Sequence, residues 1–221
     1  MKNVYGIFGA GGYGREVMPL AREQLQKSNV GLDSLFFVVD DEMLGADNIN
    51  GTAVLSLSEF MKIDAEKKWM AISVADSHAR ALLRGRSELV GLHDWTIRAS
   101  NCVIMDDVTI GDGSILSPFV TITSNVLIGK CFHANLYSYV AHDCVIGDYV
   151  TFAPGVKCNG RVNIEDHVYV GAGAVIRPGK GGAPLTIGES AIIGMGAVVT
   201  KDVPAGSTVF GNPAKIIKRS A

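Results

Sequence analysis

A histidine followed directly by an aspartate stands in the middle of the chain, within the run Ala141-His142-Asp143-Cys144. An imidazole that is neutral near physiological pH can accept a proton from an amine as the amine attacks an electrophile. A carboxylate beside the ring can orient it and stabilise the imidazolium that forms. We therefore predict that His142 is a general base and Asp143 its partner, although a polar turn residue would also explain His142.

A glycine-rich run near the N-terminus, Gly9-Ala10-Gly11-Gly12-Tyr13-Gly14, fits the pattern G-x-G-x-x-G between an apolar run and a helical pattern. Glycines placed in this way let a phosphate approach the backbone at a helix N-terminus. A domain of about 100 residues holds only one mononucleotide-sized half of a dinucleotide fold, so NAD is not the expected ligand. The motif instead predicts substrate phosphate binding, at Gly11, Gly12, Tyr13 and Gly14.

Acidic residues follow the second expected strand. Asp40 and Asp41 come directly after the apolar run 35–39, and Ala75 comes directly after the run 69–74. Because ligands bind at the carboxyl edge of parallel sheets, these three positions are candidate substrate contacts. Carboxylates there can accept N–H bonds from a uracil, thymine or guanine ring, although a solvated turn pair would also explain the two acids.

Residues 1–100 alternate between short apolar runs and helical patterns, which is typical of α/β structure. Ser56 and Glu59 have the spacing of a capping box, and Asp76 is placed to cap a further helix. Arg80, on that last helix, is a weaker candidate for phosphate binding, and an exposed helical arginine would explain it equally well. The pattern predicts a small parallel Rossmann-like sheet with covering helices.

From about residue 101 an apolar residue recurs at every sixth position. Six residues make one short strand and a turn, and three such units close an 18-residue triangular coil. An ordinary β-sandwich would not keep this period, so residues 101–221 are predicted to form a parallel β-helix with one register slip at 177–186. The positions are Ile104, Ile110, Leu116, Ile122, Ile128, Ala134, Val140, Ile146, Phe152, Cys158, Ile164, Val170 and Ile176.

Composition narrows the function classes. The 221 residues carry 20 Lys and Arg against 22 Asp and Glu, a net charge of −2, which gives no footprint for nucleic acid. No run reaches the ~18 apolar residues of a membrane span, and the N-terminus lacks the pattern of a signal peptide. The four cysteines form no close pair, so we expect buried thiols in a reducing cytoplasm rather than disulfides or a metal site.

Taken together, the repeat, the run 141–147, the GAGGYGRE run and Gly211-Asn212-Pro213-Ala214 resemble the hexapeptide-repeat nucleotide-sugar N-acetyltransferases. Among these, the resemblance is nearest to the type that acts on GDP-perosamine, and the sialic acid O-acetyltransferases belong to the same superfamily. It implies left-handed coils and acetyl-CoA-dependent acetylation of the 4-amino group of a nucleotide-linked 4-amino-4,6-dideoxyhexose for surface polysaccharide. O-acetylation of sialic acid or a related sugar is the alternative.

The resemblance also implies how the parts are used. The enzyme would be a homotrimer with CoA in the groove between neighbouring prisms, and the N-terminal domain would hold the sugar nucleotide. Relatives often carry His where this chain has Tyr13 and Thr151, so the roles of those two positions stay open. The positions matching the CoA groove are Thr151, Gly160, Ala172, Gly194 and Met195.

Coil arithmetic adds two expectations. One coil of 18 residues places His142 between Ser124 and Gly160, and Gly160 would leave space above the imidazole for an acetyl group. It also places His133 one coil before Thr151. Basic residues near the C-terminus are candidate contacts for CoA phosphates, although a solvated basic tail explains them equally well; they are Lys201, Lys215, Lys218 and Arg219.

Two other functions fit the repeat less well. A trimeric γ-type carbonic anhydrase would need three histidines around zinc, but His133, His142 and His167 occupy different places in the six-residue unit. We therefore predict no metal. A catalytically silent protein that only binds sugar nucleotides is opposed by the intact His142-Asp143 pair, and turnover of acetyl-CoA distinguishes the two.

Overall fold

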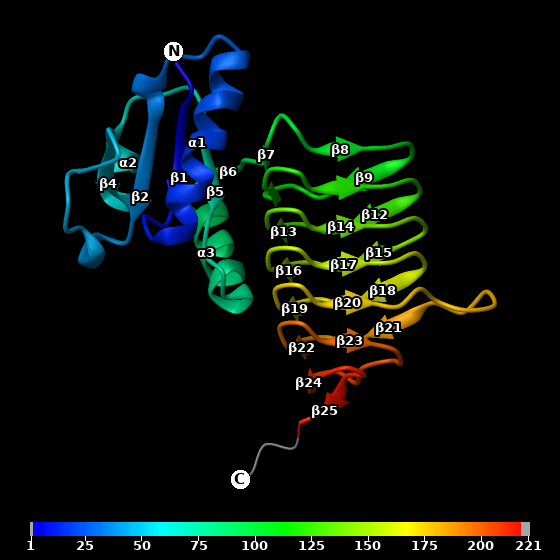
Figure 1. Ribbon diagram of the computed structural model, residues 1–221. Helices are drawn as coiled ribbons and strands as arrows, with labels where there is room; N and C mark the ends of the chain where they lie inside the picture. The colour runs from blue at the N-terminus through cyan, green and yellow to red at the C-terminus, as the bar shows by residue number, and fades with distance from the viewer. Residues whose placement is uncertain (1, 218–221) are drawn as a thin grey trace. The chain divides into compact units, whose positions relative to one another are not determined.

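The computed structural model describes residues 2–217, and the chain divides into two compact units that meet in sequence at Ser100 and Asn101 (Figure 1). The first unit is built on one sheet with the spatial strand order β3-β4-β2-β1-β5-β6. Neighbouring strands are parallel except β3 and β4, which form a hairpin. The strands of this sheet are β1 (Val4–Phe8), β2 (Leu35–Val39), β3 (Asn48–Ile49), β4 (Thr52–Ser56), β5 (Lys68–Ile72) and β6 (His93–Asp94); β7 (Ile97–Arg98), also within residues 1–100, is not part of it.

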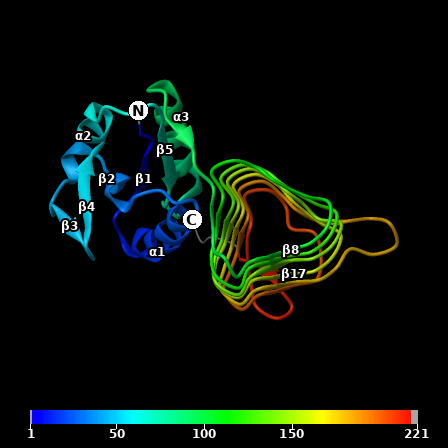
Figure 2. The same cartoon turned by 90° about the horizontal axis from the view of Figure 1, so that it is seen from above.

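Helices α1 (Gly12–Lys27), α2 (Leu57–Lys62) and α3 (Ser77–Leu89) connect these strands, with 3₁₀ turns at Leu32–Ser34 and Asp41–Met43. Figure 2 shows α1 on one face of the sheet and α2 and α3 on the other. The expected capping box is confirmed, because the Ser56 hydroxyl and the Glu59 carboxylate each accept the other residue's backbone N–H. Apart from the β3–β4 hairpin, the strand pairings confirm the predicted parallel α/β sheet.

The carboxyl ends of β1 and β5 form the edge at which the strand order reverses, since α1 leads away to one side and α3 to the other. The Ser73 hydroxyl donates to the carbonyl oxygens of Phe8, at 2.9 Å, and Gly9, at 3.1 Å, and ties the two strand ends together. A Cβ on Gly14 would collide with the Gly9 carbonyl, so only glycine lets α1 start this close to β1.

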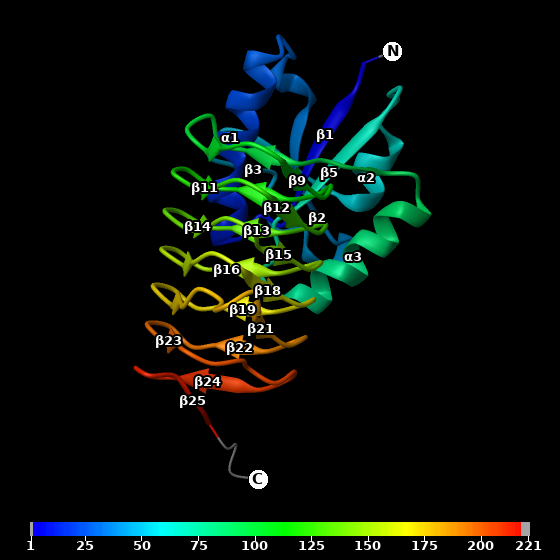
Figure 3. The same cartoon turned by 90° about the vertical axis from the view of Figure 1, so that its right-hand side faces the viewer.

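The second unit is a left-handed β-helix of triangular cross-section, seen along its axis in Figure 2 and from the side in Figure 3. Its strands stack into three faces, each a sheet of mainly parallel strands, which confirms the predicted architecture. Face 1 holds β10 (Ile115–Leu116), β13 (His133–Ala134), β16 (Thr151–Phe152), β19 (Tyr169–Val170), β22 (Ile192–Ile193), β24 (Thr208–Phe210) and the antiparallel β25 (Lys215–Ile216).

The other two faces complete each coil. Face 2 holds β8 (Val103–Ile104), β11 (Thr121–Ile122), β14 (Tyr139–Val140), β17 (Lys157–Cys158), β20 (Val175–Ile176) and β23 (Val198–Val199). Face 3 holds β9 (Val108–Ile110), β12 (Val126–Ile128), β15 (Val145–Ile146), β18 (Val162–Ile164) and β21 (Leu185–Ile187).

The coil repeat follows the predicted register. His133 pairs with Thr151 on face 1, and Tyr139 pairs with Lys157 on face 2, each one 18-residue coil apart. The inward-pointing residues form one continuous core in which Leu116, Phe152 and Ile176 are fully buried. The register slip is a loop at 177–184, which Figure 2 shows projecting from one corner of the triangle. After the loop Val162 pairs with Leu185, so the stack continues.

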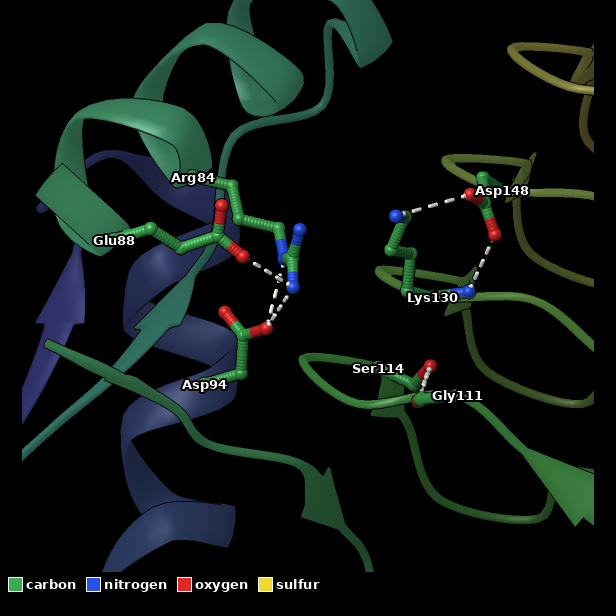
Figure 4. A network of polar contacts seen from close by, with 7 residues as sticks. All are labelled: Arg84, Glu88, Asp94, Gly111, Ser114, Lys130 and Asp148. Carbon is green, nitrogen blue, oxygen red and sulfur yellow. Dashed lines mark hydrogen bonds and ion pairs between the residues drawn. The ribbon is translucent and has the colours of Figure 1, made fainter.

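The turns from face 3 to face 1 share a column of carboxylates that we call the aspartate ladder. Asp148 Oδ1 accepts the backbone N–H of Lys130 at 2.9 Å, and Asp166 Oδ1 accepts that of Asp148 at 2.8 Å. Figure 4 shows the first rung, where Lys130 Nζ also lies 3.5 Å from Asp148 Oδ2. Each carboxylate satisfies a backbone donor one coil earlier.

Candidate active site

His142 lies in the turn from face 2 to face 3, between β14 and β15. Its Nδ1 is 2.7 Å from Asp143 Oδ2, and both side chains are about half exposed. Asp143 has φ +59°, the left-handed conformation that turns its carboxylate back toward the preceding side chain. In a neutral ring, Nδ1–H donates to this carboxylate, so Nε2 keeps a lone pair and can act as the base.

Gly160 lies one coil after His142, and the imidazole packs against its backbone. A Cβ at this position would be 2.6 Å from both Cε1 and Nε2 of the ring. The room left by the missing side chain is therefore filled by the imidazole itself, which differs from the expectation that an acetyl group would lie there. Gly160 sets where the ring can lie, and its neighbour Arg161 donates its backbone N–H to the His142 carbonyl at 2.9 Å.

Several groups favour the ionised form of Asp143. The hydrogen bond from His142 lowers the pKa of this carboxyl most, and a hydrogen bond from Asn125 and the positive charge of Arg161 lower it further. Asn125 Nδ2 lies 3.4 Å from Asp143 Oδ1. The carboxylate is thus available to stabilise an imidazolium at His142 throughout the neutral pH range.

The residues expected to line the CoA groove do not gather around His142 within one prism. Ala172, Gly194 and Met195 lie in the turns from face 1 to face 2, whereas Gly160 shares the column of His142. Met195 is 69% exposed, so its column presents an accessible apolar side chain. One prism therefore carries the two parts of the expected site on two different corners.

Thr151 and His133 lie on a third part of the prism. They are paired neighbours in β16 and β13 of face 1, and both side chains are buried, with 4% and 0% of their surface exposed. Thr151 follows His142 by nine positions, and this stretch spans a whole face of the coil. Within one prism, Thr151 is thus separate from the His142 turn.

The glycine-rich run places two kinds of glycine at the start of α1. A Cβ on Gly11 or Gly12 would meet no atom within 4 Å, so the backbone there is open to a ligand. Gly14 is instead buried against Gly9, and the residue before it, Tyr13, is half-buried. The first N–H groups of a helix have no partner within the helix, which suits an anion at Gly11 and Gly12.

Asp40 and Asp41 line a cavity of about 600 Å³ at the carboxyl edge of the sheet, and both are held by residues that the sequence did not point to. Arg86 Nη2 donates to Asp40 Oδ1 at 2.6 Å. Asp41 accepts the backbone N–H of Ser58 at 3.0 Å and a short hydrogen bond from its hydroxyl, which lowers the pKa of Asp41. Arg86, on α3, had no sequence signal, because only the fold brings it to β2.

Arg80 is a support of the loop that carries Ala75, and its expected role as a phosphate ligand is wrong. The side chain is fully buried, and its Nη1 donates to the carbonyl oxygens of Val74 at 2.8 Å and Ala75 at 3.1 Å. Burying a guanidinium requires such partners. Ala75 itself is exposed at the carboxyl edge of β5, where substrate contact was expected.

The remaining candidates lie elsewhere. His133, His142 and His167 occupy face 1, the face 2–3 turn and the face 3–1 turn, and no three ligating side chains gather anywhere in residues 2–217. Nor does any helix within this range have the length and apolar character to cross a membrane. Of the basic candidates, Lys201 follows β23 and Lys215 lies in β25, while Lys218 and Arg219 are outside the described residues.

The chain is similar to acetyltransferases over its whole length, although no family model matches it. It is 54% identical to GDP-perosamine N-acetyltransferase of Escherichia coli O157:H7, over 99% of this chain and 98% of that protein. The structure of WeeI from Acinetobacter baumannii AYE covers 98% of this chain and 100% of its own, with a TM-score of 0.93 and 52% identity.

A more distant structure shares the fold. PerB from Caulobacter crescentus, solved in complex with CoA and GDP-perosamine, has a TM-score of 0.83 at 24% identity, covering 97% of each chain. Full-length identity to an N-acetyltransferase favours N-acetylation over the O-acetylation of the alternative. The protein is an acetyl-CoA-dependent N-acetyltransferase, and it belongs to the GDP-perosamine N-acetyltransferase family.

Proposed function

We propose that the enzyme transfers the acetyl group of acetyl-CoA to the 4-amino group of GDP-perosamine or a closely related nucleotide-linked 4-amino-4,6-dideoxyhexose. One observation carries the proposal: the His142–Asp143 pair, with Nδ1 bound at 2.7 Å, leaves Nε2 as an exposed base in a chain 54% identical to a GDP-perosamine N-acetyltransferase. Such a base is what an amine acceptor requires.

The reaction then follows from the base. The amine nitrogen attacks the thioester carbonyl carbon, and the C–N bond forms as the carbonyl electron pair moves onto oxygen. Nε2 of His142 takes the proton from the nitrogen, while Asp143 stabilises the imidazolium. When the carbonyl re-forms, the C–S bond breaks, and the imidazolium returns the proton to the CoA thiolate. A backbone N–H on the groove wall would stabilise the oxyanion.

The complete site requires a neighbouring subunit, and we assign a homotrimer. His142 and Gly160 lie on the face 2–3 corner, whereas Ala172, Gly194 and Met195 lie on the face 1–2 corner of the same prism. A closed ring of three prisms brings the face 2–3 corner of each subunit against the neighbouring subunit and makes three equivalent CoA grooves. Thr151 is assigned to that groove only through the resemblance of its position.

The α/β unit is assigned the sugar nucleotide. The open backbone at Gly11 and Gly12 suits a diphosphate, and the cavity at Asp40 and Asp41 suits a base with N–H donors. Ala75 and Tyr13 complete this group of substrate contacts. We place the reaction in the cytoplasm, where acetyl-CoA is made, and in the supply of an N-acetylated sugar for O-antigen or another surface polysaccharide.

Substrate identity is tested with a panel of GDP-, UDP- and dTDP-linked 4-amino-4,6-dideoxyhexoses and acetyl-CoA, scored by release of free thiol. We expect GDP-perosamine to give the highest kcat/KM and an N-acetylated product. A product acetylated on oxygen, or thiol release with every nucleotide at the same rate, would contradict the proposal. Light scattering should give three times the mass of one chain, and a monomer at working concentration would contradict the trimer.

A further inference from the structure

We propose that Asn125 and Arg161 are positioning residues for the catalytic pair, stacked on either side of Asp143 in the face 2–3 turns. The inference rests on the proposed function, since it assigns the control of the base at that same site. Neither residue touches the reacting atoms. They act by holding one carboxylate ionised and aimed at His142 Nδ1.

The repeat places these residues in one column. Asn125, Asp143 and Arg161 are 18 residues apart, and all three have left-handed backbone, with φ of +59°, +59° and +58°. Asp107, with φ +53°, occupies the same place one coil before Asn125. Equal backbone conformation at equal coil positions places these residues on the same corner of the prism, where the Asn125 amide reaches the Asp143 carboxylate.

Asn125 limits how the Asp143 carboxylate can turn. Its Nδ2 lies 3.4 Å from Oδ1, while the other oxygen, Oδ2, is 2.7 Å from His142 Nδ1. An amide donor on one oxygen and an imidazole donor on the other fix the rotation of the carboxylate about its side-chain bond. Because Gly160 limits the ring on the side of the following coil, the imidazole is held from two directions.

Arg161 supplies positive charge from the following coil and lowers the pKa of Asp143. The lowered pKa keeps the Asp143 carboxylate ionised, so it can stabilise the imidazolium that forms when His142 takes a proton. Two further titratable groups lie in the same stretch of chain: the Cys144 thiol, which donates to the His142 carbonyl at 3.7 Å, and the Tyr139 hydroxyl, which donates to Asn159 at 2.9 Å. Arg177 and Lys180 follow in the next turn of this column.

The first test uses NMR titration of the His142 imidazole in the full-length protein, which needs no substrate. Asn125→Asp adds a like charge beside Asp143 and favours the protonated ring. The titration midpoint should rise by about half a pH unit. Arg161→Gln removes an opposing charge and should move the midpoint in the same direction. Ser190→Asp, at a left-handed position of the face 3–1 turns, is the matched control and should leave it unchanged.

The second test measures kcat and KM for Asn125→Gly, which keeps the left-handed turn and removes only the amide. We expect kcat to fall about fivefold to twentyfold, with both KM values unchanged and the melting temperature matching that of the control Ser190→Gly. The acidic limb of the pH–rate profile should move upward in Asn125→Asp.

The outcomes separate the two proposals. A parent enzyme that does not acetylate any sugar nucleotide contradicts the proposed function, while the titration still decides the inference. Parent activity together with an unchanged His142 midpoint in Asn125→Asp overturns the positioning role. So does an Asn125→Gly variant that loses melting temperature but keeps kcat, since Asn125 would then only support the turn.

Discussion

Two turn columns of the same prism use aspartate in different ways. In the face 3–1 turns, Asp148 and Asp166 each accept a hydrogen bond from a backbone N–H one coil earlier, so these carboxylates stabilise the stacking of the coils. In the face 2–3 turns, Asp143 Oδ2 instead accepts a hydrogen bond from the imidazole Nδ1 of His142, at 2.7 Å. A turn carboxylate can therefore take part in catalysis when its hydrogen-bond partner is a side chain that can exchange a proton.

Removal of the His142 imidazole should give the largest difference in activity between the two turn columns. His142→Ala should lower kcat about 10²–10⁴-fold, because the proton on the attacking amine loses its acceptor. The KM for acetyl-CoA should change much less. His167→Ala in the face 3–1 turns is the control, and steady-state kinetics should show near-parent kcat for it. Equal losses in the two variants would mean that the columns do not differ in function.

The glycines of the two columns provide the second test. In Gly160→Ala the new Cβ would lie 2.6 Å from the ring atoms of His142, which can swing aside. We expect kcat to fall about tenfold to a hundredfold with little change in stability. In Gly147→Ala the Cβ meets backbone of the next coil, so the free energy of unfolding should fall by about 1–3 kcal/mol. Denaturant melts and kinetics on both variants check this crossed pattern.

The α/β unit extends the comparison to a carboxylate assigned to substrate. Asp40→Ala should raise the KM for the sugar nucleotide about tenfold, because one charge-assisted hydrogen bond is lost while Arg86 already occupies the other oxygen. Isothermal titration should show unchanged acetyl-CoA binding. Weakened acetyl-CoA binding with parent-like binding of the sugar nucleotide would reverse the assignment of the two units.

The smallest expected effect is a pH dependence of stability at Asp143. Its folded-state pKa lies below the ordinary value, chiefly because of the hydrogen bond from His142. The ionised carboxylate therefore stabilises the fold above about pH 4, and this contribution disappears as the pH falls through the lowered pKa. Asp143→Asn should melt slightly below the parent at pH 7, and the difference should narrow as the pH falls below about 4. A difference that does not change with pH would assign the effect to packing.

Features encoded by neighbours in sequence were predictable. The Ser56–Glu59 capping box spans one helical turn, and the apolar residues at every sixth position report the coil directly, because each points into the same core. The His142–Asp143 contact was predictable for the same reason, since the two residues are adjacent.

Features that depend on the return path of the chain were not predictable. Arg86 reaches Asp40 across 46 residues, and no local pattern marks that pair. Arg80 has the sequence setting of an exposed helical arginine, yet two loop carbonyls accept its protons and allow it to be buried. The corner on which each groove residue lies depends on the face to which each strand belongs.

The loop at 177–184 shows how this fold can change its length. The chain gains residues at one corner, and Leu185 then resumes pairing with Val162, so the strands on both sides keep their neighbours. An insertion inside a strand would instead rotate every later aliphatic residue out of the interior. Natural variation in length should therefore fall at corners or in whole coils. Duplication of a coil would lengthen the groove by one rung without altering the chemistry at His142.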